Sequence, residues 1–150
     1  RDTLRLEVCY PLNGSDLSPQ RTPLQAGMKF AIAMGKGEFV GREKIVDQIE
    51  NGMDERLIAF VMREKSAPPR PHYKIFSGEA ELGEIASGGL SPSLNEGIGM
   101  AYLPVAFCKT GTGIEIDIRG CRFKAEVIKT PIYKKALQAH PQPPLKPIKK

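Results

Sequence analysis

The sequence predicts a mainly β protein built around an antiparallel Greek-key β-barrel. Six or so short segments with strand patterns follow one another from about residue 55 to residue 129, and no helical pattern separates them. The clearest pair lies at residues 114–118 and 123–127, where apolar residues alternate with charged ones on either side of Gly120. This alternation is typical of a hairpin with one face toward a core.

The other strands of the barrel are predicted from apolar runs and turn residues. Residues 57–62 form a continuous apolar run, which is typical of a strand buried on both faces. Residues 73–76 and 82–86 are predicted to pair as a hairpin, and residues 98–105 form a further apolar strand. The Gly- and Ser-rich stretch at 87–94 is predicted to be a loop.

Residues 4–9 alternate with period two, and Leu4, Leu6 and Val8 share one side. This pattern predicts a half-buried strand that sends Glu7 to the opposite face. On the pattern alone Glu7 is a solvated residue, because carboxylates are mostly exposed. If that face lines a cavity, the strand instead holds a carboxylate on a rigid element.

One more strand and one helix are predicted before the barrel. Residues 28–34 are a short apolar run and are predicted to be a strand. Residues 41–52 carry an apolar stripe at helical spacing and end in Asn-Gly, which suits the left-handed end of a helix. Residues 1–52 are too few to form a second independent core. We therefore expect them to be the end of a preceding domain, and residues 136–150 to be a Pro/Lys-rich tail.

The charge and cysteine content of the chain restrict the kinds of ligand and partner that we expect, but they do not identify a function. The net charge of +5 suits an anionic ligand, an acidic protein partner or nucleic acid. The basic residues are interleaved with acidic ones and no aromatic platform is evident, which argues against nucleic-acid binding. The three cysteines lack metal-ligand spacing, so free thiols in a reducing compartment are expected. No signal peptide or membrane-length apolar stretch is found.

No catalytic constellation or metal site is predicted. Neither His72 nor His140 has a Cys, Asp or Glu at metal-ligand spacing. The glycines at 35–41 are spaced one residue too far apart for a dinucleotide fingerprint, and K-T-G-T-G at 109–113 lacks the phosphate-loop pattern. The serines lack a nucleophile elbow.

Six segments, taken in order, match the pattern of one family. They are R-D-T-L-R-L-E at 1–7, Y-P-L-N-G-S-D-L at 10–17, E-F-V-G-R-E at 38–43, G-E-I-A-S-G-G-L-S-P-S-L at 83–94, I-G-M-A-Y-L-P at 98–104 and K-T-P-I-Y-K-K at 129–135. Together they resemble the C-terminal part of the glycine cleavage T-protein family of aminomethyltransferases.

The resemblance implies a division of the chain and a function. Residues 1–52 would be the α+β end of a truncated folate-binding domain, 53–135 the barrel and 136–150 the tail. The full-length enzyme would take an aminomethyl group from the lipoyl arm of the H protein, release ammonia and pass the one-carbon unit to tetrahydrofolate. The implied location is the cytoplasm, or the mitochondrial matrix in a eukaryote. The aspartate at the reacting centre belongs to the missing N-terminal part, so this chain supplies no catalytic residue and is expected to be inactive alone.

The resemblance also implies three folate-binding residues. Glu7 matches the position expected to bind the pterin, where a carboxylate can accept two hydrogen bonds in a fork. Lys36 and Lys135 are the candidates for a folate carboxylate. The chain departs from the family at Val8-Cys9, where the family usually has Ala-Gly, and at Asn13, where it usually has Tyr.

Two alternatives remain open at this point. The folate modules of sarcosine and dimethylglycine dehydrogenases are similar, but these enzymes need an upstream flavin domain. Folate-linked iron–sulfur assembly proteins typically have K-G-C-Y-x-G-Q-E where residues 36–43 lack both the Cys and the Gln. A basic nucleic-acid-binding barrel is the less favoured alternative from another class.

Overall fold

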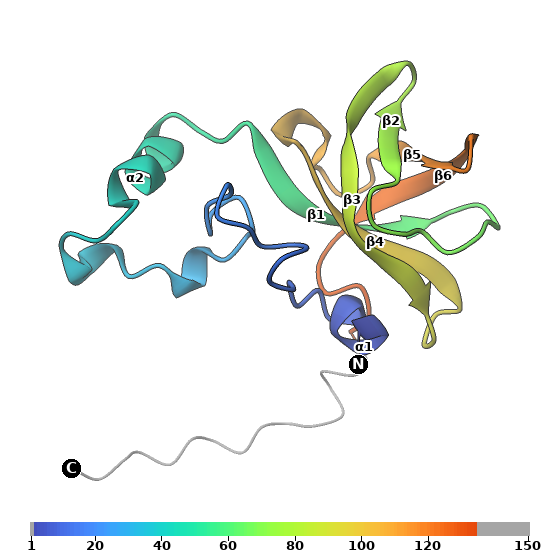
Figure 1. Ribbon diagram of the computed structural model, residues 1–150, viewed down its shortest axis with the longest axis horizontal. Coiled ribbons are helices and arrows are strands. Elements are labelled where there is room, and N and C mark those ends of the chain that lie inside the picture. Colours follow the sequence, from blue (N-terminus) through green and yellow to red (C-terminus); the bar gives the residue numbers. More distant parts are fainter. Residues whose placement is uncertain (1, 135–150) are drawn as a thin grey trace, which may run out of the picture.

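The computed structural model describes residues 2–134. A six-stranded barrel forms one end of this part of the chain, and a segment with two α helices and short 3-10 turns precedes it (Figure 1). The predicted tail at 136–150 lies outside the described residues, and the predicted domain boundary after residue 52 stays a prediction.

The strands close into one antiparallel barrel in the order β1-β4-β3-β2-β5-β6, with β6 pairing back to β1. Three consecutive strands, β2, β3 and β4, are neighbours, and β1 lies beside β4, which is the Greek-key arrangement. The predicted fold class is therefore confirmed. The strands are β1 (Glu55–Met62), β2 (Lys74–Ser77), β3 (Ala80–Ser91), β4 (Glu96–Pro104), β5 (Gly113–Ile118) and β6 (Cys121–Ile128).

The inside of the barrel is filled by aliphatic side chains and one aromatic ring. Phe60 on β1 is fully buried and packs with Ile75, Leu103 and Ile116 from three other strands. The alternation predicted for the β5–β6 hairpin is confirmed, because its isoleucines point into this core.

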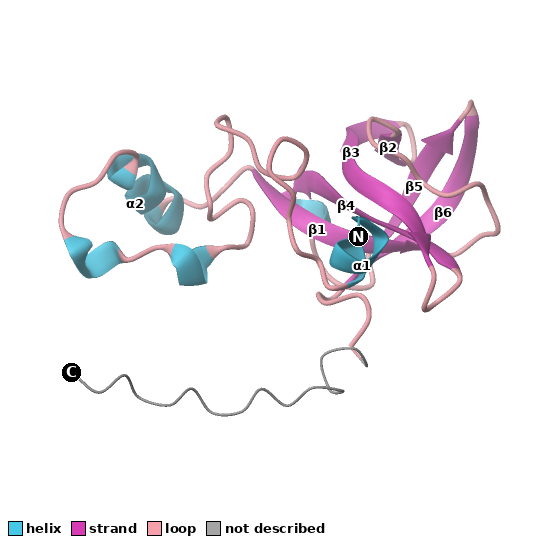
Figure 2. Cartoon of the chain, turned by 60° about the horizontal axis from the view of Figure 1, so that its bottom comes forward, coloured by secondary structure: helices cyan, strands magenta, loops and turns pink. Residues whose placement is uncertain are grey.

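A second apolar cluster lies on the outer side of β1 and β4. Ala59, Val61, Ile98 and Met100 are buried there beneath Leu6 from the N-terminal helix. Strand β1 is therefore buried on both faces, as its continuous apolar run predicts. The cartoon shows this helix, α1, lying against the strands of the barrel (Figure 2).

The prediction of a strand over residues 4–9 is wrong. Residues Asp2–Glu7 form the helix α1, and Leu6 alone of the three alternating apolar residues is fully buried, while Leu4 is 60% exposed. A closed barrel offers no free edge to a further strand, and a helix needs no pairing partner. The helix ends in a Schellman motif, in which the Tyr10 N–H donates to the Arg5 carbonyl and the Cys9 N–H to the Leu6 carbonyl.

Two other predictions of local structure are corrected. Residues 28–34 form two 3-10 turns, η1 (Lys29–Ala31) and η2 (Met34–Lys36), rather than a strand, and Phe30 is 87% exposed. The stretch at 87–94 is not simply a loop, because β3 continues to Ser91. Close packing requires the first of its two glycines, because a Cβ on Gly88 would lie 2.8 Å from the Pro69 carbonyl oxygen.

The predicted helix at 41–52 is confirmed as α2 (Arg42–Glu50). Its apolar stripe is only partly covered, since Ile45 is buried and Ile49 is 47% exposed. Gly52, just past its end, has a φ of +93° and supplies the left-handed residue that the Asn-Gly sequence predicts.

The end of α1 yields a stability prediction at Cys9, which has a φ of +58° in the left-handed region. We expect Cys9→Gly to be more stable than Cys9→Ala by about 1 kcal/mol, because both lose the thiol but only glycine adopts this φ freely. Urea unfolding of the two variants measures the difference. Equal stabilities would contradict the assigned backbone conformation.

Candidate functional site

The predicted pterin residue, Glu7, is buried and 3% exposed, at the C-terminal end of α1. Its Oε1 accepts hydrogen bonds from the Ser91 hydroxyl and from the Ser93 backbone N–H, the latter at 3.0 Å. Its Oε2 accepts one from the Ser93 hydroxyl at 3.0 Å. The carboxylate therefore faces the β3–β4 turn of the barrel and is well satisfied there.

Burial and hydrogen bonding act on the Glu7 carboxyl in opposite directions. Burial raises its pKa, but the hydrogen bonds from Ser91 and Ser93 favour the ionised form, and the net pKa lies below the ordinary value of 4.5. Glu7 is accordingly a carboxylate held ionised by neutral donors.

Acid should weaken this arrangement in a predictable pH range. A lowered folded-state pKa stabilises the protein fully above the unfolded value near 4.5, and that stabilisation is lost as pH falls through the folded value. We expect the free energy of unfolding to fall below about pH 4.5, less steeply for Glu7→Gln than for the wild type. Denaturant titrations between pH 3 and 7 test this, and identical slopes would contradict it.

A second polar group binds the other side of the same helix to the barrel. The Arg5 guanidinium donates to Asp16 at 2.6 Å, to Asp2 at 2.7 Å and to the Ser87 hydroxyl of β3 at 2.9 Å. The Asp16 side chain is fully buried, and the backbone carbonyl oxygen of the same residue accepts a hydrogen bond from the Tyr102 hydroxyl at 2.7 Å. Arg5 and Glu7 thus hold α1 to β3 on either side of Leu6.

Lys36 is exposed at the end of η2 and lines a pocket of about 550 Å³. Lys44 of α2 lines the same pocket, as do the apolar side chains of Phe39 and Ile45. Two lysines beside an apolar wall suit an anionic group on a partly apolar ligand. Glu7 does not line this pocket, so the structure does not bring the two predicted residues together. Lys135 lies outside the described residues.

Within residues 2–134 the side chains offer no evident reaction chemistry. No group of three or more His, Cys, Asp or Glu residues is placed to hold a metal ion. Burial raises the pKa of the Cys9 thiol to about 11 and also raises that of Cys108, so neither is a thiolate at neutral pH. His72 is exposed, 3.4 Å from Glu84. In this part of the chain no helix has the length and apolar character required to cross a membrane.

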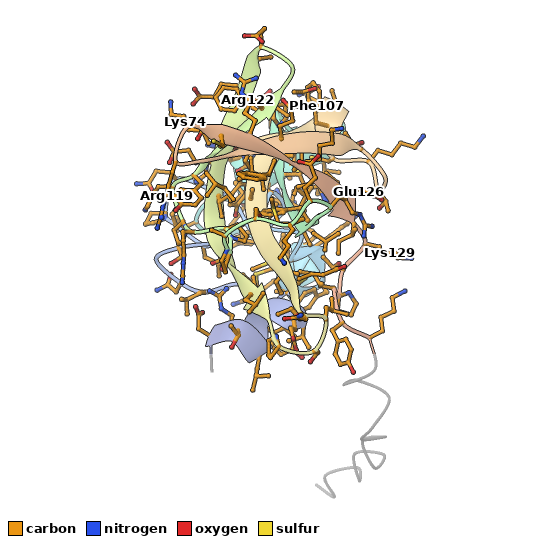
Figure 3. The ribbon with its side chains drawn as sticks, turned by 90° about the vertical axis from the view of Figure 1, so that its right-hand side faces the viewer. Lys74, Phe107, Arg119, Arg122, Glu126 and Lys129 are labelled. Carbon is orange, nitrogen blue, oxygen red and sulfur yellow. The ribbon has the colours of Figure 1, made fainter. Side chains whose placement is uncertain are left out.

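Several basic side chains on the outside of the barrel are paired with acidic ones. Lys74 contacts Glu81 at 2.9 Å, and Arg63 contacts Glu126 at the same distance. Figure 3 labels Arg122 among the side chains of the barrel. Its guanidinium lies over the Phe76 ring, 4.1 Å from the ring centroid. Acidic residues interleaved with basic ones in this way interrupt the continuous basic stripe that is typical of proteins that bind phosphate backbones.

The sequence does not predict the residues that surround Glu7 and Leu6 in the structure, which are Ser91, Ser93 and the Arg5–Asp16 pair. Both serines belong to the S-G-G-L-S-P-S-L stretch at residues 87–94. This stretch contributes to the family resemblance, but its composition predicts only a loop. The resemblance itself offered a signal, because two of its six segments, R-D-T-L-R-L-E and the one that contains S-P-S-L, are in contact in the structure.

The fold and the contacts define a class of protein: a closed Greek-key barrel with a short acidic-ended helix held to its outer face. The family model described as the glycine cleavage T-protein C-terminal barrel domain matches residues 55–134. The aminomethyltransferases of Bacillus mycoides (strain KBAB4) and Bacillus cereus (strain B4264) are each 42% identical over 137 residues, which cover 91% of this chain and 37% of theirs.

A solved structure agrees with the sequence relatives. The crystal structure of glycine cleavage system aminomethyltransferase T from Bartonella henselae is similar with a TM-score of 0.82 and 28% identity, covering 88% of this chain and 37% of that chain. The chain therefore belongs to the glycine cleavage T-protein family. It spans a little over a third of the length of the relatives that it matches.

Proposed function

We propose that this chain is the C-terminal part of an aminomethyltransferase of the glycine cleavage system. The full-length protein would transfer the one-carbon unit from the aminomethyl-lipoyl H protein to tetrahydrofolate and release ammonia. The observation that supports this most strongly is the 42% identity to aminomethyltransferases over 91% of the chain. Location in the cytoplasm, or in the mitochondrial matrix of a eukaryote, belongs to the same proposal.

Tetrahydrofolate is the proposed cofactor, and the described residues would supply only part of its site. Lys36, together with Lys44, offers positive charge for a folate carboxylate beside an apolar wall. Lys135 remains a second candidate for that carboxylate. The pterin would be held largely by the part of the protein that lies outside this chain.

The proposed pterin role of Glu7 is limited by the hydrogen bonds that its carboxylate already accepts. Its Oε1 already accepts two hydrogen bonds and its Oε2 one. A carboxylate has about four acceptor positions. Two further hydrogen bonds, donated by a pterin, would therefore have to replace at least one of the hydrogen bonds from Ser91 or Ser93. Direct contact with folate and attachment to the barrel are therefore competing roles for this side chain.

A comparison of this chain with the full-length protein tests the proposal. Each is mixed with H protein carrying an aminomethyl-lipoyl group and with tetrahydrofolate, and methylenetetrahydrofolate and ammonia are measured. We expect both products from the full-length protein and neither from the 150-residue chain. Production of neither by the full-length protein would refute the proposed function.

A further inference from the structure

We infer that Arg5 and Asp16 form a positioning pair, which fixes α1 against the loop that follows it and against the barrel, and so presents the Glu7 carboxylate to the pterin of tetrahydrofolate. The inference rests on the proposed function, because it concerns the contact between Glu7 and the pterin. Neither residue of the pair touches folate. Both act through the direction of the helix that ends at Glu7.

The first support is that all three nitrogens of the Arg5 guanidinium donate hydrogen bonds. Its Nε donates to Asp2, one terminal nitrogen donates to Asp16, and the other donates to the Ser87 hydroxyl. A guanidinium is planar and its donors point in fixed directions, so these partners define its orientation. Because Asp2 is exposed and an exposed ion pair contributes little, the orientation depends mainly on the buried partners Asp16 and Ser87.

The second support is the burial of the Asp16 carboxylate. Its Oδ2 accepts hydrogen bonds from Arg5 and from the Leu12 N–H, the latter at 2.9 Å. Its Oδ1 is buried and accepts no hydrogen bond from the described residues. Arg5 is therefore the group that compensates this buried charge, and separating the two would be strongly unfavourable. Asp16 is itself fixed to β4, because its backbone carbonyl accepts the hydrogen bond from Tyr102.

The third support is a β-bulge in β3. The pairing of β3 with β4 shifts between Ile85 and Ser87, so that Ala86 has no residue of its own opposite it. Ile85 packs in the core of the barrel, and strict alternation would send Ser87 inward as well. The bulge instead turns Ser87 to the outer side, where its hydroxyl accepts the hydrogen bond from Arg5. The irregularity of the strand thus supplies the barrel's part of the attachment.

The fourth support concerns the complex with the pterin. Two hydrogen bonds from the pterin would replace at least one from Ser91 or Ser93, so the barrel would hold Glu7 itself less firmly. In the part of the chain that the structure describes, the remaining polar side-chain contacts of α1 are those of Arg5. A six-residue helix has little stability of its own. The Arg5–Asp16 pair is therefore the attachment that directs the helix while Glu7 binds.

The most informative variant replaces the whole pair by uncharged residues, Arg5→Met together with Asp16→Asn. The asparagine keeps an acceptor for the Leu12 N–H, the methionine keeps an apolar stem, and no buried charge is left without a partner. Ser87→Ala is the milder variant, because it removes the contact with the barrel and leaves the ion pair. The control is the same kind of double substitution in a barrel ion pair, Arg63→Met with Glu126→Gln.

The first measurement is the affinity of the full-length protein, by calorimetry, for tetrahydrofolate and for its 2-desamino analogue, which lacks the amino group that would donate to Glu7. We expect the uncharged pair to weaken tetrahydrofolate binding about 10-fold and binding of the analogue by no more than about 3-fold. Ser87→Ala should change both affinities in the same sense by smaller factors, and the control should bind both ligands like the wild type. A purely structural role would instead weaken both ligands alike.

The second measurement asks whether the pair acts through Glu7. Because the pair is inferred to work by placing that carboxylate, replacing it in a Glu7→Gln background should cause no further loss of tetrahydrofolate affinity. The inference is overturned if the two losses add, if both ligands lose affinity equally, or if the uncharged pair binds tetrahydrofolate like the wild type. Should the uncharged pair fail to fold, Ser87→Ala is judged by the same three criteria.

A third measurement does not depend on folate. The Cys9 and Tyr10 N–H groups close the end of α1, so hydrogen exchange in the full-length protein reports how firmly that end is held. We expect both amides to exchange faster in Ser87→Ala, and faster still in the uncharged pair, while the amides of β1 are unaffected. Unchanged exchange at Cys9 and Tyr10 would overturn the inference. Absence of tetrahydrofolate binding by the wild type would instead refute the proposed function, and exchange alone would then decide whether the pair holds the helix.

Discussion

Phe60→Ala is expected to lower the free energy of unfolding by about 3–5 kcal/mol. Phe60 is 0% exposed and is the single large aromatic side chain fully inside the barrel core of the described residues. Its removal leaves a cavity between strands that are hydrogen-bonded on both sides, so the walls have little freedom to collapse. Urea unfolding followed by circular dichroism gives the change.

The control is the same substitution at Phe30, which is 87% exposed in η1. We expect Phe30→Ala to change the free energy of unfolding by less than about 0.5 kcal/mol. A comparable loss in both variants would mean that Phe30 is covered in solution and that the exposed face of residues 28–36 is not as described.

Gly99→Ala is the second substitution for which we expect a large loss, about 1–3 kcal/mol or more. Gly99 lies directly opposite Phe60 in the β1–β4 pairing. An added Cβ would lie 2.7 Å from both Phe60 Cε1 and the Ser87 carbonyl oxygen. The ring can give way only by leaving the core, and the backbone oxygen cannot give way without breaking the β3–β4 pairing.

A double variant separates the two clashes. Phe60→Leu shortens the opposing side chain, so Gly99→Ala should cost less in that background than in the wild type, and the remainder measures the Ser87 contact. Gly35→Ala is the control, because nothing lies within 4 Å of its Cβ position. Equal costs for Gly99→Ala in both backgrounds would contradict the assigned packing of the Phe60 ring.

The barrel was predictable from the sequence because each of its strands has a pattern set by its own surroundings. Alternating isoleucines in β5 reflect one buried face, and the unbroken apolar run in β1 reflects two. The end of β3 was missed because Gly88 and Gly89 normally indicate a loop. Gly88 is nevertheless part of the strand because the Pro69 backbone packs so closely against it that a side chain would not fit.

The N-terminal helix was missed for a different physical reason. A six-residue helix is too short to display a 3.6-residue period, so the accidental alternation of Leu4, Leu6 and Val8 favoured a strand. What decides its structure is the Schellman motif at Cys9 and the contacts of Arg5 and Glu7 with a distant strand. None of these is expressed in the spacing of apolar residues.

In the candidate site, too, the sequence predicts a residue of interest but not the distant residues that contact it. The resemblance selected Glu7 as a residue of interest, and the structure gives its carboxylate three donors from residues 91 and 93. Its pterin role stays a prediction, as do the roles of Lys36 and Lys135. Which groups surround a side chain depends on the folded chain, and the sequence alone could not name Ser91 and Ser93 as its partners.

The closure of the barrel has a consequence for its motions. Strand β2 has four residues and meets β5 at only two paired positions, Ile75 with Ile116 and Phe76 with Glu115, whereas β1 and β4 share seven. Local opening follows the fewest bonds to be broken. The amide hydrogens between β2 and β5 should therefore exchange with solvent long before those of β1, as the barrel opens between these two strands into a curved sheet that β1 and β4 still hold together.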